Sequence, residues 1–524
     1  MKKHSNSSKN EEVTKNKVSY KKYILYIFLL LLISTLIFHQ LKPLPDGLNV
    51  ASEIYEIEEN QLTFLQDLTY FIGDQRITEH RIFDEVLVMI DEAQEFIIID
   101  MFLFNEDMTQ EELQNSSLVN RNITSQITQH LVAKKQENPD VEIIFITDGI
   151  NNFYGSFTPK HYELLEENNI TIIQTDMTKL RDSNYIYSTF YRVFLQWFGV
   201  GKNGIIPHPL GNDQHTVTLR SGLKLLNFKA NHRKLIITDS NQGFSTLITS
   251  ANPHTPSNLH SNIALRIDNS PIIIDMMRSE FNIATFSTSK TDNTHILNSF
   301  ENIINRTQNY FNRYETTIFS SHNISSNTST IQFLSEKQIK NSILRDIQNT
   351  QRGDRIELSM FYLSSRSIIN ELILASERGV EIKLILDHNV DAFGHEKNGI
   401  PNRVVAHELL ENSNISIRWY NTQGEQFHSK QLTIYKFETN TTIVHLGSTN
   451  YTQRNLDNFN LEANIRLQLS TNSGVSNEIS QIFKRIWNNE NDIEYTINVE
   501  EYVDSSILKY IWYRIQEFTG LGTF

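Results

Sequence analysis

Two stretches that lie far apart in the chain have nearly the same sequence pattern. The first contains His232 and Lys234, and the second contains His428 and Lys430. In each stretch the histidine and the lysine are separated by one position on an apolar run typical of a β-strand. Their side chains therefore lie on the same face of that strand. The repetition predicts two similar halves that bring two histidines and two lysines to one site.

A Ser-x-Asn sequence follows each of these strands at a distance of about twenty residues. It consists of Ser250 and Asn252 in the first half, and of Ser448 and Asn450 in the second, where Gly447 precedes the serine. Because the two copies occupy corresponding places in the repeat, we expect both to serve the same site.

The elements that precede the two strands also repeat. Each half contains an amphipathic helix, a buried strand and a second buried strand that ends in an aspartate. The predicted segments are 82–93, 95–103 and 141–148 in the first half, and 339–348, 355–363 and 380–387 in the second. Strands that alternate with helices predict an α/β fold with a layered sheet in each half.

The lengths of the two halves differ. We predict a first domain at 45–309, a Ser-, Asn- and Thr-rich linker at 310–335, and a second domain at 336–524. The first domain is longer because it contains an insertion at about 160–225.

Two aromatic helices are predicted outside the repeated elements. Aromatic residues recur at helical spacing within 185–198, which favours a helix that packs on the core. The same pattern on an anchored protein also fits a helix that dips into a bilayer interface. The tail from Ser506 to Phe518 predicts a C-terminal helix that is too short to cross a membrane and that packs on the body.

The N-terminal segment is strongly hydrophobic. Residues 23–41 form a nearly continuous apolar run, near the lower length limit for a membrane-spanning helix. Seven lysines and two glutamates precede it, so the positive-inside rule keeps the basic tail at 1–22 in the cytoplasm. No small-x-small cleavage site follows, which favours a single-pass signal anchor over a cleaved signal peptide. We expect a cell-membrane protein whose catalytic domains are extracytoplasmic.

The overall composition limits the partners and the cofactors. The 524 residues carry a formal net charge of -14 and include no cysteine. An acidic total argues against a nucleic-acid partner, which usually meets a basic face. The absence of cysteine excludes disulfides and thiolate metal sites. No obligatory protein partner is indicated.

Histidines and lysines on one strand face favour phosphodiester chemistry. One imidazole attacks phosphorus, and the other protonates the leaving alcohol. We expect Lys234 and Lys430 to stabilise the charge of the non-bridging oxygens, and Asn252 and Asn450 to donate hydrogen bonds to the same oxygens. Because the lysines take the place of a divalent cation in this scheme, we expect no metal and no cofactor.

These motifs resemble the signature of the phospholipase D superfamily, which is His-x-Lys-x4-Asp followed by Gly-Ser-x-Asn and normally occurs twice. The resemblance covers about 45–520. Asp239 completes the first signature, whereas Tyr435 replaces the aspartate of the second. The resemblance implies two α/β/α layered domains related by a pseudo-twofold axis, a covalent phosphohistidine intermediate and no metal requirement.

Each histidine needs a partner that fixes its tautomer. The segment after the second Ser-x-Asn contains Glu462, which matches an acidic residue downstream of the family's motif, whereas His260 stands where the first half would have its acid. With Tyr435 in place of an aspartate, the two halves are unequal. These differences favour His232 as the nucleophile and His428 as the general acid and base.

The sequence thus predicts a membrane-anchored phosphodiesterase of phospholipase D type, which acts on the phospholipid membrane and cleaves or transfers phosphatidyl groups. The predicted catalytic residues are His232, Lys234, Asp239, Asn252, His428, Lys430, Asn450 and Glu462, and the predicted substrate contacts are Ser250, Gly447 and Ser448. Two alternatives stay open. One is an exported nuclease of the same superfamily, and the other is a non-catalytic membrane protein on the same scaffold.

Overall fold

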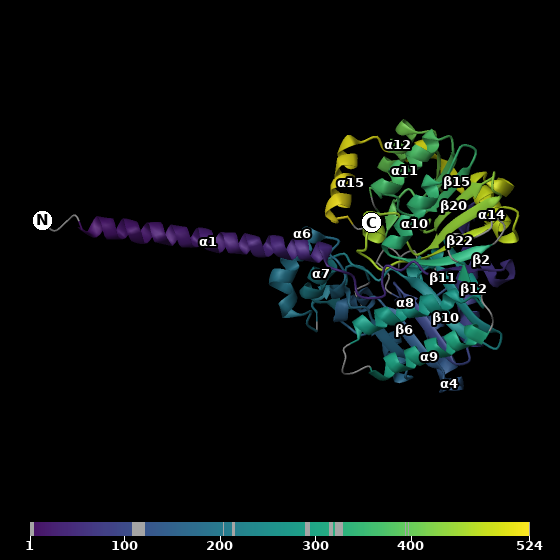
Figure 1. Cartoon of the computed structure of the whole chain (residues 1–524), viewed down its shortest axis with the longest axis horizontal. Helices are drawn as coiled ribbons and strands as arrows, with labels where there is room; N and C mark the ends of the chain where they lie inside the picture. The colour runs from purple at the N-terminus through teal and green to yellow at the C-terminus, as the bar shows by residue number, and fades with distance from the viewer. Residues whose placement is uncertain are drawn as a thin grey trace.

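Two β-sheets covered by helices form the body of the protein, and one long helix projects from it (Figure 1). The structure is a computed structural model that describes residues 5–106, 121–202, 204–211, 215–288, 294–313, 318–319, 329–392, 395–396, 398–522 and 524. Strands alternate with helices along both halves of the chain. The predicted α/β fold is therefore confirmed.

The first sheet is built from seven strands of the first half. They are β2 (Leu62–Asp67), β5 (Phe96–Met101), β6 (Glu142–Thr147), β7 (Thr171–Gln174), β10 (Lys234–Ser240), β11 (Gly243–Thr249) and β12 (Asn262–Asp268). Their order across the sheet is β2-β12-β11-β10-β5-β6-β7. The pairs β5–β6 and β6–β7 are parallel, and the other pairs are antiparallel.

The second sheet repeats this arrangement and extends it at both edges. Its strands are β1 (Ile54–Glu56), β13 (Ile318–Phe319), β14 (Thr330–Ser335), β15 (Arg355–Met360), β16 (Glu381–Leu386), β19 (Ser416–Tyr420), β20 (Lys430–Lys436), β21 (Thr441–Gly447), β22 (Ala463–Ser470) and β23 (Thr496–Asn498). The order is β13-β1-β14-β22-β21-β20-β15-β16-β19-β23. From β14 to β19, both the order and the strand directions match those of the first sheet. The two halves are therefore structural repeats.

Helices at corresponding places in the chain cover the sheets. In the first half they are α2 (Arg81–Glu92), α4 (Ile123–Glu137), α5 (Lys160–Glu167), α8 (Ile272–Ser287) and α9 (Thr294–Arg313). In the second half they are α10 (Lys337–Gln348), α11 (Arg366–Glu377), α12 (Asn402–Asn412) and α14 (Gly474–Trp487). The amphipathic helices predicted at 82–93 and 339–348 correspond to α2 and α10.

The division between the halves differs from the predicted boundaries. Strand β1 belongs by sequence to the predicted first domain, yet it pairs with β13 and β14 of the second sheet. Strand β14 and the end of α9 both lie inside the predicted linker at 310–335. The polar composition of that segment concealed the strand, in which Ile331 and Phe333 alternate toward the core and are fully buried.

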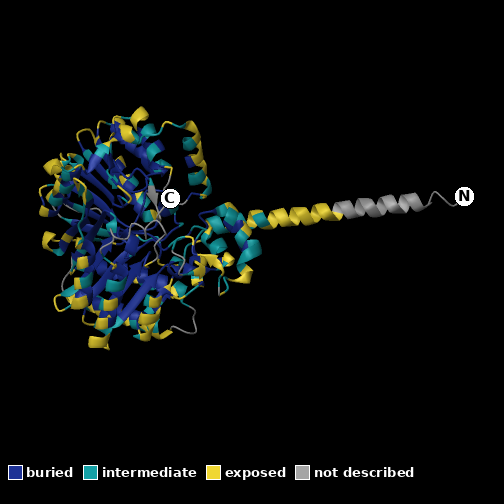
Figure 2. Cartoon of the chain, turned by 180° about the vertical axis from the view of Figure 1, so that it is seen from behind, coloured by how far each residue is buried: buried dark blue, intermediate teal, exposed yellow. Residues whose placement is uncertain are grey.

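The two sheets share one hydrophobic core. A single cluster of buried residues contains Leu235 and Ile263 from the first sheet together with Val444 and Ile465 from the second. Figure 2 shows the strands of both sheets as buried, with the exposed residues concentrated on the helices and loops. Because the sheets pack through a common core, the site between them is held by the most rigid part of the fold.

Helix α1 (Ser5–Leu41) leaves the body and is exposed over most of its described length (Figure 2). It contains Tyr20–Leu41, the one segment among the described residues that is a helix long and apolar enough to cross a membrane. This segment includes the predicted anchor at 23–41.

The aromatic insertion does not pack on the core in the way that was predicted. Helix α6 (Tyr185–Phe190) continues into a π-helical turn at Tyr191–Leu195. The buried residues of this region are polar, and they include Arg192, whose guanidinium pairs with Asp182 at 2.8 Å. Trp197 remains 75% exposed. The prediction of a core-facing aromatic helix was therefore wrong, because an ion pair rather than the aromatic rings fastens this segment to the body.

A buried ion-pair network lies directly behind the first His-x-Lys pair. Arg233 directly precedes β10 and is fully buried. Its Nη1 donates to Glu280 at 2.7 Å, and its Nη2 donates to Glu336 at 2.7 Å. Glu280 lies on α8 of the first half, and Glu336 precedes α10 of the second. One guanidinium therefore joins both halves behind the catalytic strand.

We expect Arg233→Ala to destabilise the protein strongly. The substitution leaves two carboxylates buried without their shared cation, and breaking a buried pair in this way costs on the order of 3–5 kcal/mol. The denaturant midpoint of the full-length protein in detergent measures this loss.

Arg306→Ala is the matched control for this prediction. Arg306 pairs with Glu95 at the same 2.7 Å, but both side chains are more than half exposed. Its loss should change stability by less than about 1 kcal/mol. Equal midpoints for the two variants would contradict the assigned role of the buried network.

Candidate active site

Beside each histidine, the backbone of one half is hydrogen-bonded to a segment of the other half. The amide of His232 donates to the carbonyl of Leu461 at 2.9 Å, and the amide of His428 donates to the carbonyl of Ser261 at 2.8 Å. An isolated parallel bridge accompanies each of these hydrogen bonds. The two contacts correspond to each other in the repeat. In each case, the residue that follows the accepting carbonyl lies beside the histidine of the other half.

His232 is held by a carboxylate from the second half. Its Nδ1 lies 2.8 Å from Oε1 of Glu462, and both side chains are buried. A carboxylate only accepts, so Nδ1 carries the proton and Nε2 keeps its lone pair. His232 is therefore oriented to act through Nε2 as a nucleophile or base.

His428 is held by an amide from the first half. Its Nδ1 lies 3.0 Å from Oδ1 of Asn262, whose Nδ2 donates to the carbonyl of His260 at 3.0 Å. The prediction that His260 takes the place of an acid was wrong. Asn262 contacts His428 from the position directly after Ser261, just as Glu462 contacts His232 from the position directly after Leu461. The ring of His260 is still close, with its centroid 5.9 Å from that of His428.

The two serines of the Ser-x-Asn motifs hold these partner residues. Ser250 donates to Oδ1 of Asn262 at 2.9 Å, and Ser448 donates to Oε2 of Glu462. The amide of Asn455 also donates to Glu462, at its Oε1. Both serine hydroxyls were predicted to contact substrate. The structure corrects this, because each is used to position the residue that orients a histidine.

The two lysines are buried beside two aromatic rings. The Nζ of Lys234 and that of Lys430 each donate to the carbonyl of the histidine two positions earlier, at 2.7 and 2.9 Å. Lys234 lies over Phe102 at 5.2 Å, and Lys430 lies over Phe361 at 5.6 Å. The same rings contact the histidines, with centroid distances of 5.0 and 5.1 Å.

Sequence reasoning missed both phenylalanines as parts of the site. The sequence feature that could have identified them is a Met-Phe dipeptide, which is repeated at the ends of β5 and β15. Their rings fill the apolar side of the site and give each lysine a cation–π contact in place of water.

The aspartates that directly follow β6 and β16 hold the backbone just before each histidine. Oδ2 of Asp148 accepts from the amide of Asn231 at 2.8 Å, and Oδ2 of Asp387 accepts from the amide of Phe427 at 2.7 Å. Each of these amides belongs to the residue just before a histidine. The repeated aspartates therefore hold the backbone of the site.

Asp239 was predicted to be catalytic, and the structure contradicts this. It lies five residues beyond Lys234 on β10, which is about 16 Å along a strand. Its carboxylate accepts from the backbone amides of Glu95 and Phe96, at 3.0 Å each. In the second half Tyr435 occupies the matching place, and Arg355 lies over its ring at 4.4 Å. Tyr435 therefore lies on β20 seven residues beyond His428, with its ring against Arg355.

Gly447 has a packing role. A Cβ at this position would come within 2.3 Å of the carbonyl oxygen of Ala463 on β22. Gly447 was predicted to contact substrate. In the structure it instead allows β21 and β22 to approach each other closely.

Asn252 and Asn450 remain available to a ligand. Within the described part of the chain, the side-chain Oδ1 of each is buried and has no hydrogen-bond partner. A buried polar group without a partner in matching places of two repeats indicates where a bound molecule would be contacted.

The titratable groups of the site influence one another electrostatically across the two halves. Burial lowers the pKa of His232 to about 4, although Glu462 opposes this effect. Burial also lowers the pKa of Lys234 to about 7. The pKa of His428 is held well below its ordinary value by burial and by the charge of Lys430. Both histidines are therefore neutral near pH 7 when no anion is bound.

The two lysines disfavour each other's charge. The pKa of Lys430 is held well below its usual range by burial and by Lys234. An anion placed between them would restore both charges. The arrangement can therefore bind a phosphate group, attack it with one imidazole and exchange a proton with the other. Among the described residues, no group of three or more acidic or histidine side chains could hold a metal ion.

The sequence of the second half matches a known domain family. Residues 343–487 match the family model described as "Cardiolipin synthase, PLD-like domain". The matched segment includes His428, Lys430, Asn450 and Glu462. No curated protein sequence matches the chain.

Solved structures align with the chain at low sequence identity. Phosphatidylserine synthase from Haemophilus influenzae Rd KW20 aligns over 91% of this chain and 97% of its own, with a TM-score of 0.53 and 10% identity. Polyphosphate kinase from Porphyromonas gingivalis aligns over 88% of this chain and 56% of its own, with a TM-score of 0.43 and 14% identity. The phospholipase D family member Nuc from Salmonella typhimurium aligns over 32% of this chain and 99% of its own, with a TM-score of 0.25 and 17% identity. The first alignment shows that the two chains share a fold.

The pKa directions predict a bell-shaped pH profile for kcat/KM on a chromogenic phosphodiester such as bis(4-nitrophenyl) phosphate. Protonation of His232 below about pH 4 removes the nucleophile, so activity falls toward lower pH. Deprotonation of Lys234 above about pH 7 removes a phosphate-binding charge, so kcat/KM falls toward higher pH.

Lys234→Arg separates the alkaline limb from other effects. A guanidinium keeps its charge throughout this range, so the alkaline fall should move to higher pH even if the maximal rate is lower. A wild-type kcat/KM that stays constant well above pH 7 would rule out this role for Lys234.

Proposed function

We propose that the chain is a membrane-anchored phosphodiesterase of the phospholipase D superfamily that cleaves phospholipids or transfers their phosphatidyl groups. The observation that carries the proposal is the pair of buried histidines, each oriented by a residue of the opposite half. Glu462 orients His232, and Asn262 orients His428. Lys234 and Lys430 complete the group with two cations.

In the first step, Nε2 of His232 attacks phosphorus while the bond from phosphorus to the leaving alcohol breaks. Nε2–H of His428 gives its proton to the departing oxygen, and that imidazole becomes neutral. The bound phosphodiester is itself an anion, and its charge raises the proton affinity of His428 before the step. The product is a phosphatidyl group on His232 and a free alcohol.

In the second step, water or another alcohol attacks the phosphorus of the phosphohistidine. His428 accepts the proton of the attacking oxygen, and the phosphorus–nitrogen bond to His232 breaks. Water yields phosphatidic acid, and an alcohol yields a new phosphodiester. Both routes return the two imidazoles to their starting protonation states.

The unequal partners assign the two roles. A phosphohistidine carries a positive charge shared by its ring, and the Glu462 carboxylate stabilises that charge on His232. Asn262 offers His428 a neutral oxygen, so an imidazolium there is less stabilised and is the stronger acid. These properties suit a nucleophile at His232 and a general acid at His428.

A lipid substrate is supported by the domain family and by the N-terminal helix. The second half matches a domain described for cardiolipin synthase, and Tyr20–Leu41 is apolar and long enough to span a bilayer. The lysines before this helix favour an N-terminus in the cytoplasm and a catalytic body on the other side. A tether of this kind raises the local concentration of membrane lipids at the site.

The proposal predicts defined products from phosphatidylglycerol. Full-length protein in mixed micelles should release phosphatidic acid in water and form a phosphatidyl alcohol when a primary alcohol is added. Single-stranded DNA incubated in parallel should stay intact. Cleavage of DNA with no change in the lipid would instead support a nuclease, and no reaction with either would support a non-catalytic protein.

Each histidine should be essential for these products. We expect His232→Ala and His428→Ala each to lower the rate by at least about 10²- to 10⁴-fold. His295→Ala is the control, since His295 is exposed at the start of α9. Full activity in either active-site variant would overturn the mechanism with two histidines.

A further inference from the structure

The C-terminal helix α15 (Ile507–Thr519) has its apolar face turned outward. Its inner side packs on the body through Tyr513, which belongs to the core of the second half and donates to the carbonyl of Ser364 at 2.7 Å, and through Glu517, which accepts from the hydroxyl of Ser364 at 2.7 Å. Leu508 is 80% exposed and Phe518 is 73% exposed. The exposed apolar residues are Ile507, Leu508, Ile511, Trp512, Ile515 and Phe518. At 100° per residue they cover one continuous side of the helix.

This arrangement reverses the usual pattern of a helix that packs on a soluble body, in which the apolar side is buried. The tail helix was predicted to pack on the body, and it does so through its tyrosine and its glutamate. A continuous apolar face left open on a protein surface marks a contact with another apolar phase or molecule.

The aromatic insertion presents a second exposed apolar area. Its exposed large apolar residues include Ile186, Phe190, Trp197, Phe198, Ile205 and Leu219. From Ser183 to Gly201 the sequence contains one charged residue, Arg192, and this residue is buried against Asp182. The outer surface of this segment therefore carries no charge that would resist an apolar environment.

The insertion is fastened to the candidate membrane span. The rings of Phe28 and Phe194 are 5.8 Å apart, and Arg181 donates to the carbonyl of Lys42 at 2.9 Å. Phe28 lies thirteen residues before Leu41, which is about 20 Å along the helix axis. A bilayer crossed by Tyr20–Leu41 would therefore also reach the insertion.

Helix α15 and the insertion face the side of the body from which α1 emerges. In Figure 1, α15 runs crosswise to α1 on that side, and the reverse view in Figure 2 shows its outer residues as exposed. The rings of Tyr185 and Phe518 are 6.3 Å apart, so the two apolar areas meet. A helix that lies across the direction of a membrane span is parallel to the membrane plane.

We propose that the exposed apolar face of α15 and the exposed apolar residues of the insertion form one docking surface for the lipid bilayer that contains α1. The helix lies in the interface with its apolar side toward the acyl chains. Lys509 and Arg514 flank this side, where long basic chains reach the headgroups.

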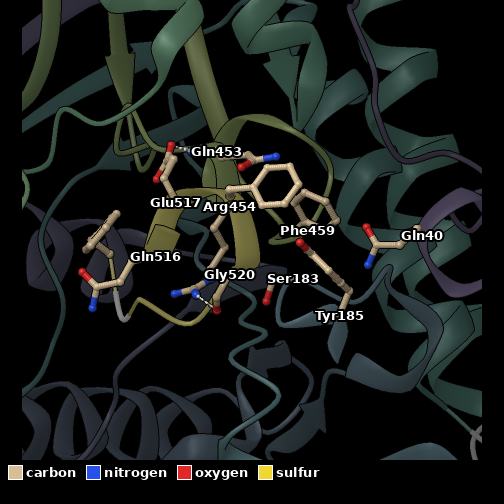
Figure 3. Close-up of a pocket in the computed structure, with 11 residues that line it drawn as sticks. Gln40, Ser183, Tyr185, Gln453, Arg454, Phe459, Gln516, Glu517 and Gly520 are labelled. Carbon is tan, nitrogen blue, oxygen red and sulfur yellow. Dashed lines mark hydrogen bonds between the residues drawn. The ribbon is translucent and has the colours of Figure 1, made fainter. Parts of the chain in front are cut away.

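A small pocket lies where α1, the insertion and α15 meet the second half (Figure 3). It is lined by Gln40 of α1, Tyr185 of the insertion, Phe518 of α15 and Arg454 of the second half. The residue after Arg454 is Asn455, whose amide donates to Glu462. The pocket therefore adjoins the short helix α13 (Gln453–Leu456), whose Asn455 contacts the partner of His232.

The tryptophans of the protein provide a direct test. Trp197 and Trp512 lie on the docking surface, whereas Trp419 is fully buried and Trp487 is on α14. Full-length protein is reconstituted in phosphatidylcholine vesicles with brominated acyl chains, which quench only nearby tryptophans. We expect bromolipids to quench the wild-type fluorescence, and to have almost no effect on a Trp197→Phe/Trp512→Phe double variant.

Trp487→Phe is the matched control and should leave the quenching by bromolipids unchanged. Quenching of Trp512 by aqueous iodide but not by bromolipids would overturn the proposal, because the face would then be in water. Protection from both quenchers would also overturn it, since a second protein would then cover the face. Tryptophan quenching does not require lipid turnover, so its result tests the docking surface independently of the proposed catalytic activity.

Discussion

The exchange of backbone hydrogen bonds beside His232 and His428 is the constraint on which the active site depends. Neither half can orient its own histidine, because Glu462 and Asn262 reach it from the opposite half. The shared core and the buried Arg233 network hold the sheets in the register that this exchange requires. The geometry of the proposed active site therefore depends on the packing of the two halves, and a loss of this packing would remove both histidines from their partners together.

The exchange also explains how a duplicated fold can produce an asymmetric reaction. The two halves keep the same strand order, the same lysines and the same phenylalanines, yet one histidine faces a carboxylate and the other faces an amide. A double displacement needs one group that stabilises a covalent cation and another that gives up a proton readily. In the proposed mechanism, one difference, glutamate in the second half and asparagine in the first, separates these roles.

The sequence predicted the α/β repeat, the two histidines and the two lysines, because strand periodicity places them on one face. It also pointed to Glu462, but it could not show that this residue serves His232, since the crossing of two segments far apart in the chain has no local signal. The sequence pointed to His260 instead of Asn262, because no local pattern shows which residue follows the hydrogen bond between the halves. Asp239, Ser250, Ser448 and Gly447 belong to conspicuous motifs, yet hydrogen bonding and strand packing occupy them. The outward apolar face of α15 was missed because amphipathicity alone does not say which side of a helix is covered.

The location of the covalent intermediate tests the central claim most directly. Rapid quenching of the full-length protein during turnover of a phosphodiester, followed by peptide mapping under conditions that preserve phosphohistidine, identifies the residue that carries the phosphoryl group. The account predicts the group on His232, with less of it accumulating in a Glu462→Gln variant. Modification of His428 instead would contradict the assignment of roles by the exchanged partners.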